Sequence, residues 1–285
     1  IGVDPAIEIS KKAQEDGIET INEFFNWETS EKIKTKYSLA SLITANNVFA
    51  HCDDLIGFTK AVSNLLTNDG LFVFEVSYLL DVYQKTLFDT IYHEHLSYHS
   101  VIPLIKLFHS NNMELIDVCR VNTHGGSIRC VVKKKQNKRQ INKSVQKLFD
   151  LESSFLLNDK NTFINFSKKI KDRKRELITL INEIKSRNKS IAGFGAPAKA
   201  TTLMYEFALD NDILDFIVDD SPLKQGLFSP GLHIPILPSS AINTLKPDYL
   251  LILAWNFADS IIEKNKKFTE SGGKFIIPLP NLQVI

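Results

Sequence analysis

The sequence has little of what would mark several classes of protein. Its 3 cysteines, Cys52, Cys119 and Cys130, are too few and too scattered for a disulfide framework or a zinc cage. The formal net charge is +1, so no global field favours nucleic acid or an acidic membrane. No apolar run approaches the length of a membrane span. We therefore expect a cytoplasmic protein, since few cysteines fit a reducing compartment, with neither a nucleic-acid nor a membrane partner.

What is present fits an α/β protein. Hydrophobic residues make up 44% of the 285 residues, which is ample for one large domain or two ordinary ones. Short apolar runs alternate with helical patterns in the first third of the chain, which predicts a doubly wound, mainly parallel sheet. Asn68-Asp69-Gly70 predicts a turn before the strand that begins at Leu71. Two later runs are close enough in sequence to form an antiparallel edge hairpin, Glu114–Val118 and Ser127–Val132.

The rest of the chain divides further. Five basic residues in the seven from Lys133 to Arg139 indicate a nucleic-acid patch or, in better agreement with the near-neutral total, a solvated domain boundary. A long amphipathic helix follows, with apolar residues at three- and four-residue steps. A second strand–helix pattern begins near Ser190. We predict a first domain at residues 1–138, a helical connector at 139–188 and a Rossmann-like domain at 189–285.

The chain is organised around the run that follows the strand ending at Val76. Tyr92-His93-Glu94-His95 places four titratable groups together, beyond the carboxyl end of a strand, where open α/β sheets bind ligands. A histidine can act as a base near neutral pH, a carboxylate can orient it, and a tyrosine can donate to a developing oxyanion. A packed surface loop is the plain alternative. His93-x-His95 could begin a metal site, but no further ligands follow with zinc spacing, so no metal site is predicted.

A glycine-rich turn opens the second pattern. Gly193-x-Gly195-x-x-Ala198 matches the dinucleotide fingerprint when alanine is allowed at the third position, and Asp219 follows at the distance of a ribose-binding acid. Lys199 could meet a diphosphate as a point charge. The match leaves three interpretations open: NAD binding, phosphate binding of another kind, and a structural turn with a surface lysine.

Several blocks resemble the S-adenosylmethionine-dependent C-methyltransferases that act on nucleotide-linked deoxysugars, of the tetronitrose C-methyltransferase type. They follow the order of that family across nearly the whole chain. The matching blocks are Asn47–His51, Asp69–Val76, Phe88–Tyr98, Thr123–Ser127, Gly193–Ala200 and Val218–Gly226.

The resemblance implies a class I methyltransferase (Rossmann-like) domain followed by a second, smaller Rossmann-like α/β domain. It implies S-adenosyl-L-methionine as cofactor and a small-molecule nucleotide sugar as substrate. His95 is then the base, assisted by Tyr92, Glu94 and His51. The residues implied for cofactor binding are Asp4 and Asn47, and those implied for substrate binding are Gly195, Ala196, Lys199 and Lys224.

Members of this family also carry a cysteine-rich zinc segment and a glycine-rich loop after the first strand. Neither is found in this sequence, so we expect a piece of a longer protein, with the methyltransferase domain incomplete at its N-terminus, that alone binds the cofactor poorly or not at all. The predicted reaction is methylation of carbon, at C3 of a 4-keto-deoxysugar, through an enolate. The alternatives are an NAD-dependent nucleotide-sugar oxidoreductase and a catalytically silent fragment that binds a sugar nucleotide.

Overall fold

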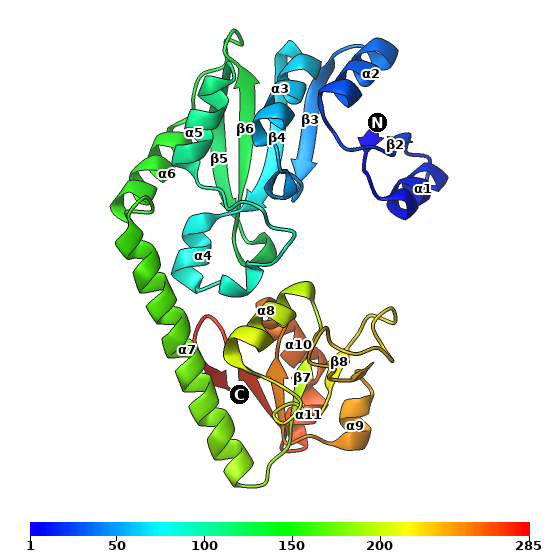
Figure 1. Cartoon of the computed structure of the whole chain (residues 1–285), viewed down its shortest axis with the longest axis vertical. Helices are drawn as coiled ribbons and strands as arrows, with labels where there is room; N and C mark the ends of the chain where they lie inside the picture. The colour runs from blue at the N-terminus through cyan, green and yellow to red at the C-terminus, as the bar shows by residue number, and fades with distance from the viewer. The chain divides into compact units, whose positions relative to one another are not determined.

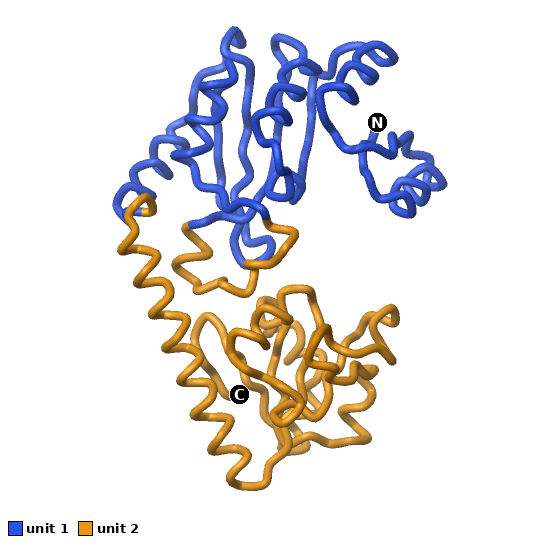
Figure 2. Tube along the Cα trace, in the orientation of Figure 1, with its two compact units in different colours: residues 1–79, 96–156 blue, residues 80–95, 157–285 orange.

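The computed structural model describes residues 1–285 and divides them into two compact units (Figure 2). Unit 1 comprises residues 1–79 and 96–156, and unit 2 comprises residues 80–95 and 157–285. The segment that carries Tyr92 and His95 therefore belongs with the C-terminal half of the chain. Most of the predicted connector, from residue 157 onward, also lies in unit 2.

The main sheet of unit 1 has four strands in the order β3-β4-β6-β5 (Figure 1). Only β3 and β4 are parallel, whereas β6 runs antiparallel to both of its neighbours. The predicted hairpin is confirmed, but the prediction of a mainly parallel sheet is wrong here because this hairpin supplies half of the strands. The strands are β3 (Ala40–Asn46), β4 (Leu66–Ser77), β5 (Met113–Val121) and β6 (Ser127–Lys134).

The expected turn at Asn68-Asp69-Gly70 is instead an irregularity inside β4. Ala40 of β3 pairs with Leu66, yet Leu42, two residues on, pairs with Leu71. The extra residues of β4 are accommodated as a bulge, which inserts residues into one strand without ending it. Turn-forming residues therefore bend this strand rather than terminate it.

The first 21 residues form a small sheet of their own. β1 (Gly2–Val3) pairs in parallel with β2 (Thr20–Ile21), and α1 (Ile7–Glu15) connects them. Gly17, at φ +82°, follows the C-cap residue Asp16, because glycine adopts this left-handed conformation without steric penalty.

Four helices cover the main sheet of unit 1. α2 packs on α3, and both α5 and α6 pack on β5. Asp54 caps α3 by accepting a hydrogen bond from the Gly57 N–H at 2.8 Å. Glu152 of α6 caps α5, since its carboxylate accepts the N–H groups of Val101 and Ile102 at 2.6 and 2.9 Å. The helices are α2 (Trp27–Tyr37), α3 (Leu55–Leu65), α5 (Val101–Ser110) and α6 (Lys143–Ser154).

The core of unit 1 is aromatic. Phe49 lies at its centre, with its ring 4.9 Å from Phe74, 5.3 Å from His99 and 6.1 Å from Phe108. All four side chains are buried. Burial lowers the pKa of His99 to about 4, because a low-dielectric surrounding disfavours the charged imidazole.

Unit 2 contains a six-stranded sheet in the order β12-β11-β10-β7-β8-β9. All pairs are parallel except β11–β12, so this sheet has the predicted Rossmann-like character. The strands are β7 (Ile191–Phe194), β8 (Ile217–Asp219), β9 (Ile236–Pro238), β10 (Tyr249–Ile252), β11 (Lys274–Ile277) and β12 (Gln283–Val284).

The longest helix of unit 2 is α7, drawn in green in Figure 1. α7 packs on α8, and the ring of its Phe166 lies 6.0 Å from that of Tyr83 on α4. No helix of the chain is both long enough and apolar enough to cross a membrane. The helices are α4 (Leu79–Lys85), α7 (Lys160–Ser186), α8 (Ala198–Phe207), α9 (Ala241–Leu245), α10 (Ala258–Lys264) and α11 (Lys266–Glu270).

Candidate functional site

A buried aspartate anchors the segment that leads to the Tyr-His-Glu-His run. Asp89 lies in a short 3-10 helix, η2 (Phe88–Thr90), and is 0% exposed. Its Oδ2 accepts a hydrogen bond from the indole Nε1–H of Trp255 at 2.6 Å and lies 3.4 Å from Lys199 Nζ. Its Oδ1 is buried without a hydrogen-bond partner. Burial raises the pKa of Asp89 in spite of the nearby ammonium group.

The imidazole of His95 is oriented by the backbone of the same segment. Its Nδ1 lies 2.7 Å from the carbonyl oxygen of Thr90. A carbonyl can only accept, so Nδ1 carries the proton of the neutral ring and the lone pair lies on Nε2. This is the tautomer that a base acting through Nε2 requires. The sequence suggested a carboxylate in this orienting role, but the Nδ1 contact is made to backbone.

Tyr92 lies against the predicted base. The two ring centroids are 4.5 Å apart. The backbone N–H of His95 donates a hydrogen bond to the backbone carbonyl of Tyr92 at 3.0 Å. Burial raises the pKa of the Tyr92 phenol, and the carboxylates of Glu94 and Asp89 raise it further. The hydroxyl therefore stays protonated at neutral pH and can donate a hydrogen bond. Glu94 is exposed and lies 3.9 Å from the ring of His93.

The fourth predicted catalytic residue belongs to the other unit. His51 is exposed at the end of η1 (Phe49–His51). The helix is fixed by the buried ring of Phe49 and by the Ser97 N–H, which donates to the Ala50 carbonyl at 3.3 Å. The structure thus brings Tyr92, Glu94 and His95 together in unit 2 and places His51 in unit 1.

Asn47 and His124 meet in unit 1. Both are non-glycine residues in the left-handed region, at φ +55° and +51°, and such strained residues cluster at functional sites. The amide Nδ2 of Asn47 lies 3.2 Å from Nε2 of His124; an amide nitrogen only donates, so Nε2 accepts. His124 was not among the predicted site residues, although it belongs to a block that resembles the family.

Glu75 connects the segments that carry Asn47 and His124. Its carboxylate is buried and accepts a hydrogen bond from the Thr123 hydroxyl at 2.5 Å and two from the guanidinium of Arg129, at 3.1 and 2.9 Å. Its carbonyl accepts the Asn47 N–H at 2.8 Å. One residue of β4 therefore fixes both the end of β3 and the β5–β6 connection.

Asp4 directly follows β1 and is half-buried. Its Oδ1 accepts the Ala6 N–H at 2.8 Å, and its carbonyl accepts from Ser10 Oγ at 2.8 Å and from Asn22 Nδ2 at 3.0 Å. These bonds fix the backbone around the acid. A held carboxylate at the carboxyl end of a strand is the kind of group that accepts hydrogen bonds from ribose hydroxyls.

The glycine-rich turn packs tightly against the end of β10. Gly195 has φ +88°, and a Cβ there would lie 2.6 Å from the Cβ of Ala254, so only glycine fits. The adjoining N–H of Ala196 donates to Asp219 Oδ2 at 2.7 Å, while Asp219 Oδ1 accepts the Ser221 N–H at 2.8 Å. The buried Asp219 thus joins two loops, a structural role where the fingerprint suggests a ribose ligand.

The two lysines that the sequence suggests for substrate binding are both paired. Lys224 Nζ lies 3.3 Å from Asp219 Oδ2 and remains half-buried. Lys199 Nζ lies 3.4 Å from Asp89 and 4.2 Å above the ring of Trp255. Its side chain is 13% exposed, and burial lowers the pKa of its ammonium group. Lys199 is therefore not the surface lysine of the structural-turn interpretation.

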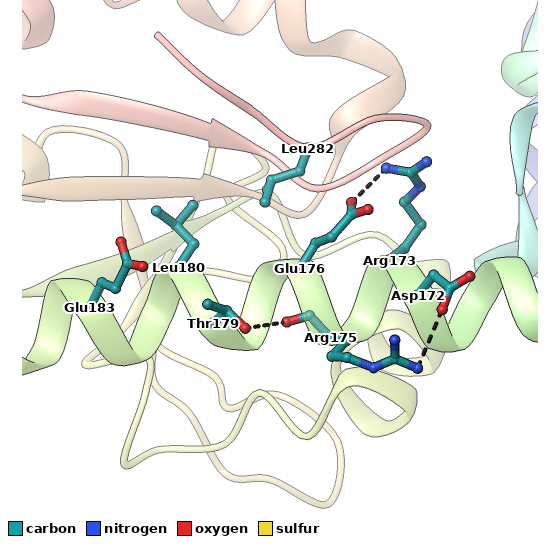
Figure 3. Close-up of a pocket in the computed structure, with 8 residues that line it drawn as sticks. All are labelled: Asp172, Arg173, Arg175, Glu176, Thr179, Leu180, Glu183 and Leu282. Carbon is teal, nitrogen blue, oxygen red and sulfur yellow. Dashed lines mark hydrogen bonds and ion pairs between the residues drawn. The ribbon is translucent and has the colours of Figure 1, made fainter.

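An open hollow of about 640 Å³ lies along α7, lined by Leu282 and seven residues of that helix (Figure 3). It contains none of the predicted site residues. Its charges are mostly compensated within the helix, since Arg173 pairs with Glu176 at 2.5 Å and Arg175 with Asp172 at 3.3 Å. No group of three histidine, cysteine, aspartate or glutamate side chains is arranged to hold a metal ion anywhere in the chain.

Comparison with known proteins decides the family. A model described as the C-methyltransferase C-terminal domain matches residues 122–280. The C-methyltransferase NovU of Streptomyces niveus is 36% identical over 285 residues, which cover 100% of this chain and 68% of NovU. The chain belongs to the C-methyltransferase family. The predictions of a C-methyltransferase and of an α/β fold are both confirmed.

Solved structures match part of this C-methyltransferase. A possible histamine N-methyltransferase from Thermotoga maritima is 16% identical and matches 46% of this chain and 72% of its own, with a TM-score of 0.34. A putative methyltransferase in complex with the Haloferax volcanii Trm112 activator is 12% identical, over 47% and 70% of the two chains, with a TM-score of 0.37.

The residues that sequence reasoning missed in this C-methyltransferase are those that act through distant partners. Asp89 and Trp255 are 166 positions apart, and His124 meets Asn47 across 77 positions. Asp89 lies close before Tyr92, inside a block that resembles the family, and this placement could have suggested it.

Proposed function

We propose that this C-methyltransferase transfers the methyl group of S-adenosyl-L-methionine to C3 of a nucleotide-linked 4-keto-deoxysugar through an enolate. The observation that carries the proposal is the contact between His95 Nδ1 and the Thr90 carbonyl at 2.7 Å, because it leaves the basic lone pair on Nε2. Membership of the family supports methylation of carbon. The deoxysugar and the C3 position rest on the resemblance of the sequence blocks and on the chemistry below.

Methylation of carbon requires a carbanion equivalent. A 4-keto group acidifies the neighbouring C3–H bond, so Nε2 of His95 takes that proton and the bonding electrons move toward the C4 oxygen. Tyr92, protonated and 4.5 Å from His95 between ring centroids, donates a hydrogen bond to the enolate oxygen. His51 and Glu94 assist at the substrate. S-adenosyl-L-methionine, when bound, supplies the methyl group as an electrophile that carbon attacks.

Separate groups bind the cofactor and the nucleotide sugar. Asp4 and Asn47 hold the cofactor, since a carboxylate accepts from ribose hydroxyls and an amide offers both donor and acceptor. The turn at Gly195 and Ala196, together with Lys224, holds the nucleotide sugar. Gly195 suits this task because its lack of a side chain permits close approach to the backbone.

An NAD-dependent oxidoreductase is the alternative function. Its ribose-binding acid would be Asp219, whose carboxylate is occupied by the N–H groups of Ala196 and Ser221 and by Lys224. Titration of the full-length protein with NADH and with S-adenosylhomocysteine separates the two functions. We expect saturable binding of S-adenosylhomocysteine, whereas tight binding of NADH alone would favour the oxidoreductase.

Product analysis tests the proposal directly. The full-length protein is incubated with S-adenosyl-L-methionine carrying a ¹³C methyl group and with nucleotide-linked 4-keto-deoxysugars. We expect a product whose ¹³C signal couples to C3 of the sugar, with S-adenosylhomocysteine in equal amount. A methyl group on oxygen, or no transfer to any such sugar while the protein binds the cofactor, would contradict the proposal.

A further inference from the structure

The segment before the Tyr-His-Glu-His run is docked on α8 at three points. The ring of Phe88 lies 5.0 Å from that of Phe207. The Thr202 hydroxyl donates to the Ile91 carbonyl at 3.3 Å. Between these two contacts Asp89 reaches Lys199 and Trp255. All of these residues lie in unit 2.

The ion pair between Asp89 and Lys199 has a large desolvation cost. An ion pair that is removed from water loses much of its hydration, and replacing such a pair by apolar residues is often neutral or stabilising. Here Asp89 is 0% exposed and Lys199 only 13% exposed in its side chain. The indole of Trp255 serves both partners, because its Nε1–H donates to the carboxylate at 2.6 Å and its ring lies 4.2 Å below the ammonium. Such an arrangement is better explained by the geometry it imposes than by stability.

The contacts of Asp89 affect the predicted base, His95, through the peptide group of Thr90. Asp89 is followed directly by Thr90, whose carbonyl accepts the Nδ1–H of His95. The Thr90 hydroxyl donates to the Leu87 carbonyl at 2.7 Å, and its N–H donates to the same carbonyl at 3.3 Å. The direction of the Thr90 carbonyl is therefore set by η2, and η2 is held by the side chain of Asp89.

We propose that Asp89, Lys199 and Trp255 are positioning residues for the reaction, which hold the Thr90 carbonyl so that His95 keeps its proton on Nδ1 and offers Nε2 to the substrate. The proposal rests on the function proposed for His95. It gives Lys199 a role other than the diphosphate ligand that the sequence suggested. It also gives Trp255, which no sequence pattern indicated, a part in catalysis without contact with substrate.

Two other roles of Asp89, Lys199 and Trp255 would have different effects on kinetics and stability. If Lys199 bound the diphosphate, its loss would raise KM for the sugar nucleotide and leave kcat unchanged. If the cluster were only structural, its loss would lower the thermal midpoint and the amount of folded enzyme without changing the properties of His95. A positioning role predicts a fall in kcat with little change in KM, since a displacement of about 1 Å can reduce the rate on the order of 100-fold.

The test uses the full-length protein with Trp255→Phe, Asp89→Asn, Lys199→Met and Lys199→Arg. Trp255→Phe keeps the ring beneath the ammonium and removes only the hydrogen bond to Asp89. Trp27→Phe and Lys264→Met are matched controls, because Trp27 is exposed and Lys264 forms an exposed ion pair with Asp220. We expect Trp255→Phe and Lys199→Met to lower kcat at least tenfold with KM within about twofold, Lys199→Arg to recover most of kcat, and both controls to match the wild type.

A second measurement keeps the result independent of turnover. ¹⁵N NMR of the imidazoles, with the His95 signals identified by their loss in His95→Asn, reports which ring nitrogen carries the proton. We expect the wild type to show the Nδ1–H form and Trp255→Phe to show a mixture of forms. If His95→Asn kept full activity, the proposed function would fail, yet the tautomer in Trp255→Phe would still decide the positioning role. Wild-type kcat together with an unchanged His95 tautomer in folded Trp255→Phe would overturn the inference, and so would a rise of KM alone in Lys199→Met.

Discussion

The carbonyl oxygen of Thr90 lies 2.7 Å from Nδ1 of His95, and this contact determines which nitrogen of the imidazole can take a proton. A backbone acceptor keeps its direction as long as the local fold holds, whereas a carboxylate side chain can rotate away. The base that we propose for this C-methyltransferase is thus oriented by main-chain geometry. In the proposed mechanism, the hydroxyl of Tyr92, whose ring lies beside His95, is the donor to the enolate oxygen.

Removal of the Tyr92 hydroxyl should slow the reaction without weakening substrate binding. Tyr92→Phe keeps the ring that lies against His95 but removes the donor to the enolate oxygen. Loss of one such donor typically lowers kcat on the order of 100-fold. Steady-state kinetics should show this fall with KM nearly unchanged. A larger effect on KM than on kcat would indicate that Tyr92 binds the ground state instead.

The pair of Asn47 and His124 should contribute to cofactor affinity. Asn47→Ala is expected to weaken binding of S-adenosylhomocysteine about fivefold, since a hydrogen bond to a ligand contributes roughly 1 kcal/mol. His124→Ala should have a smaller effect in the same direction, because it removes the acceptor that holds the amide at 3.2 Å. Calorimetric titration measures both constants. Unchanged affinity in Asn47→Ala would remove this residue from the cofactor site.

Two glycines of unit 2 allow the energetic cost of a steric clash with Ala254 to be measured separately from the cost of backbone strain. Gly195 and Gly226 have φ +88° and +81°, but a Cβ at Gly195 would lie 2.6 Å from Ala254 Cβ, while one at Gly226 would meet nothing within 4 Å. Gly226→Ala should cost about 1 kcal/mol, from conformation alone. Gly195→Ala should cost at least about 2 kcal/mol more. Chemical denaturation measures both, and equal losses would contradict the packing argument.

His99 should make stability depend on pH. Burial lowers its pKa to about 4, while an unfolded chain has a histidine pKa of about 6.5. Between these values the unfolded state binds a proton that the folded state does not, so stability falls as the pH falls from about 6.5 to about 4. From pH 7.5 to 5.0 the loss attributable to His99 is about 2 kcal/mol.

Urea denaturation at these two pH values tests the assignment. His99→Phe should lose about 2 kcal/mol less than the wild type over this interval, because phenylalanine has no proton to bind. His109→Gln is the matched control, since His109 lies exposed on α5, and it should behave as the wild type does. The same pH dependence in His99→Phe as in the wild type would show that other groups cause it.

Local features of the fold could be predicted from the sequence because their causes are local. Gly17 ends α1, Asp54 caps α3, and the hairpin of β5 and β6 follows from two strands joined by a short turn. Asn68-Asp69-Gly70 predicts a turn but forms a bulge, since the same residues favour both and only pairing with β3 distinguishes them. The cap that Glu152 provides for α5 depends on packing across 51 positions, which no spacing rule contains.

In the candidate site, too, features with local causes could be predicted and features that depend on distant residues could not. Clustering of titratable groups predicts Tyr92 and His95 as site residues, and the structure places their rings side by side. What orients His95 was not predictable, because the Thr90 carbonyl carries no mark in the sequence. Lys199 was interpreted as a phosphate ligand from its place at the start of a helix, yet its partners come from η2 and from Trp255, which are adjacent only after folding.

Hydrogen exchange at C3 of the substrate tests the role of His95 most directly. The full-length enzyme, with S-adenosylhomocysteine in place of the methyl donor, is incubated with the nucleotide-linked 4-keto-deoxysugar in D₂O. We predict that the wild type incorporates deuterium at C3. His95→Asn should bind the sugar nucleotide with unchanged affinity but exchange on the order of 100-fold or more slowly, because an asparagine amide can still donate to the Thr90 carbonyl yet cannot take a proton. Exchange at the wild-type rate in His95→Asn would contradict the assignment of His95 as the base.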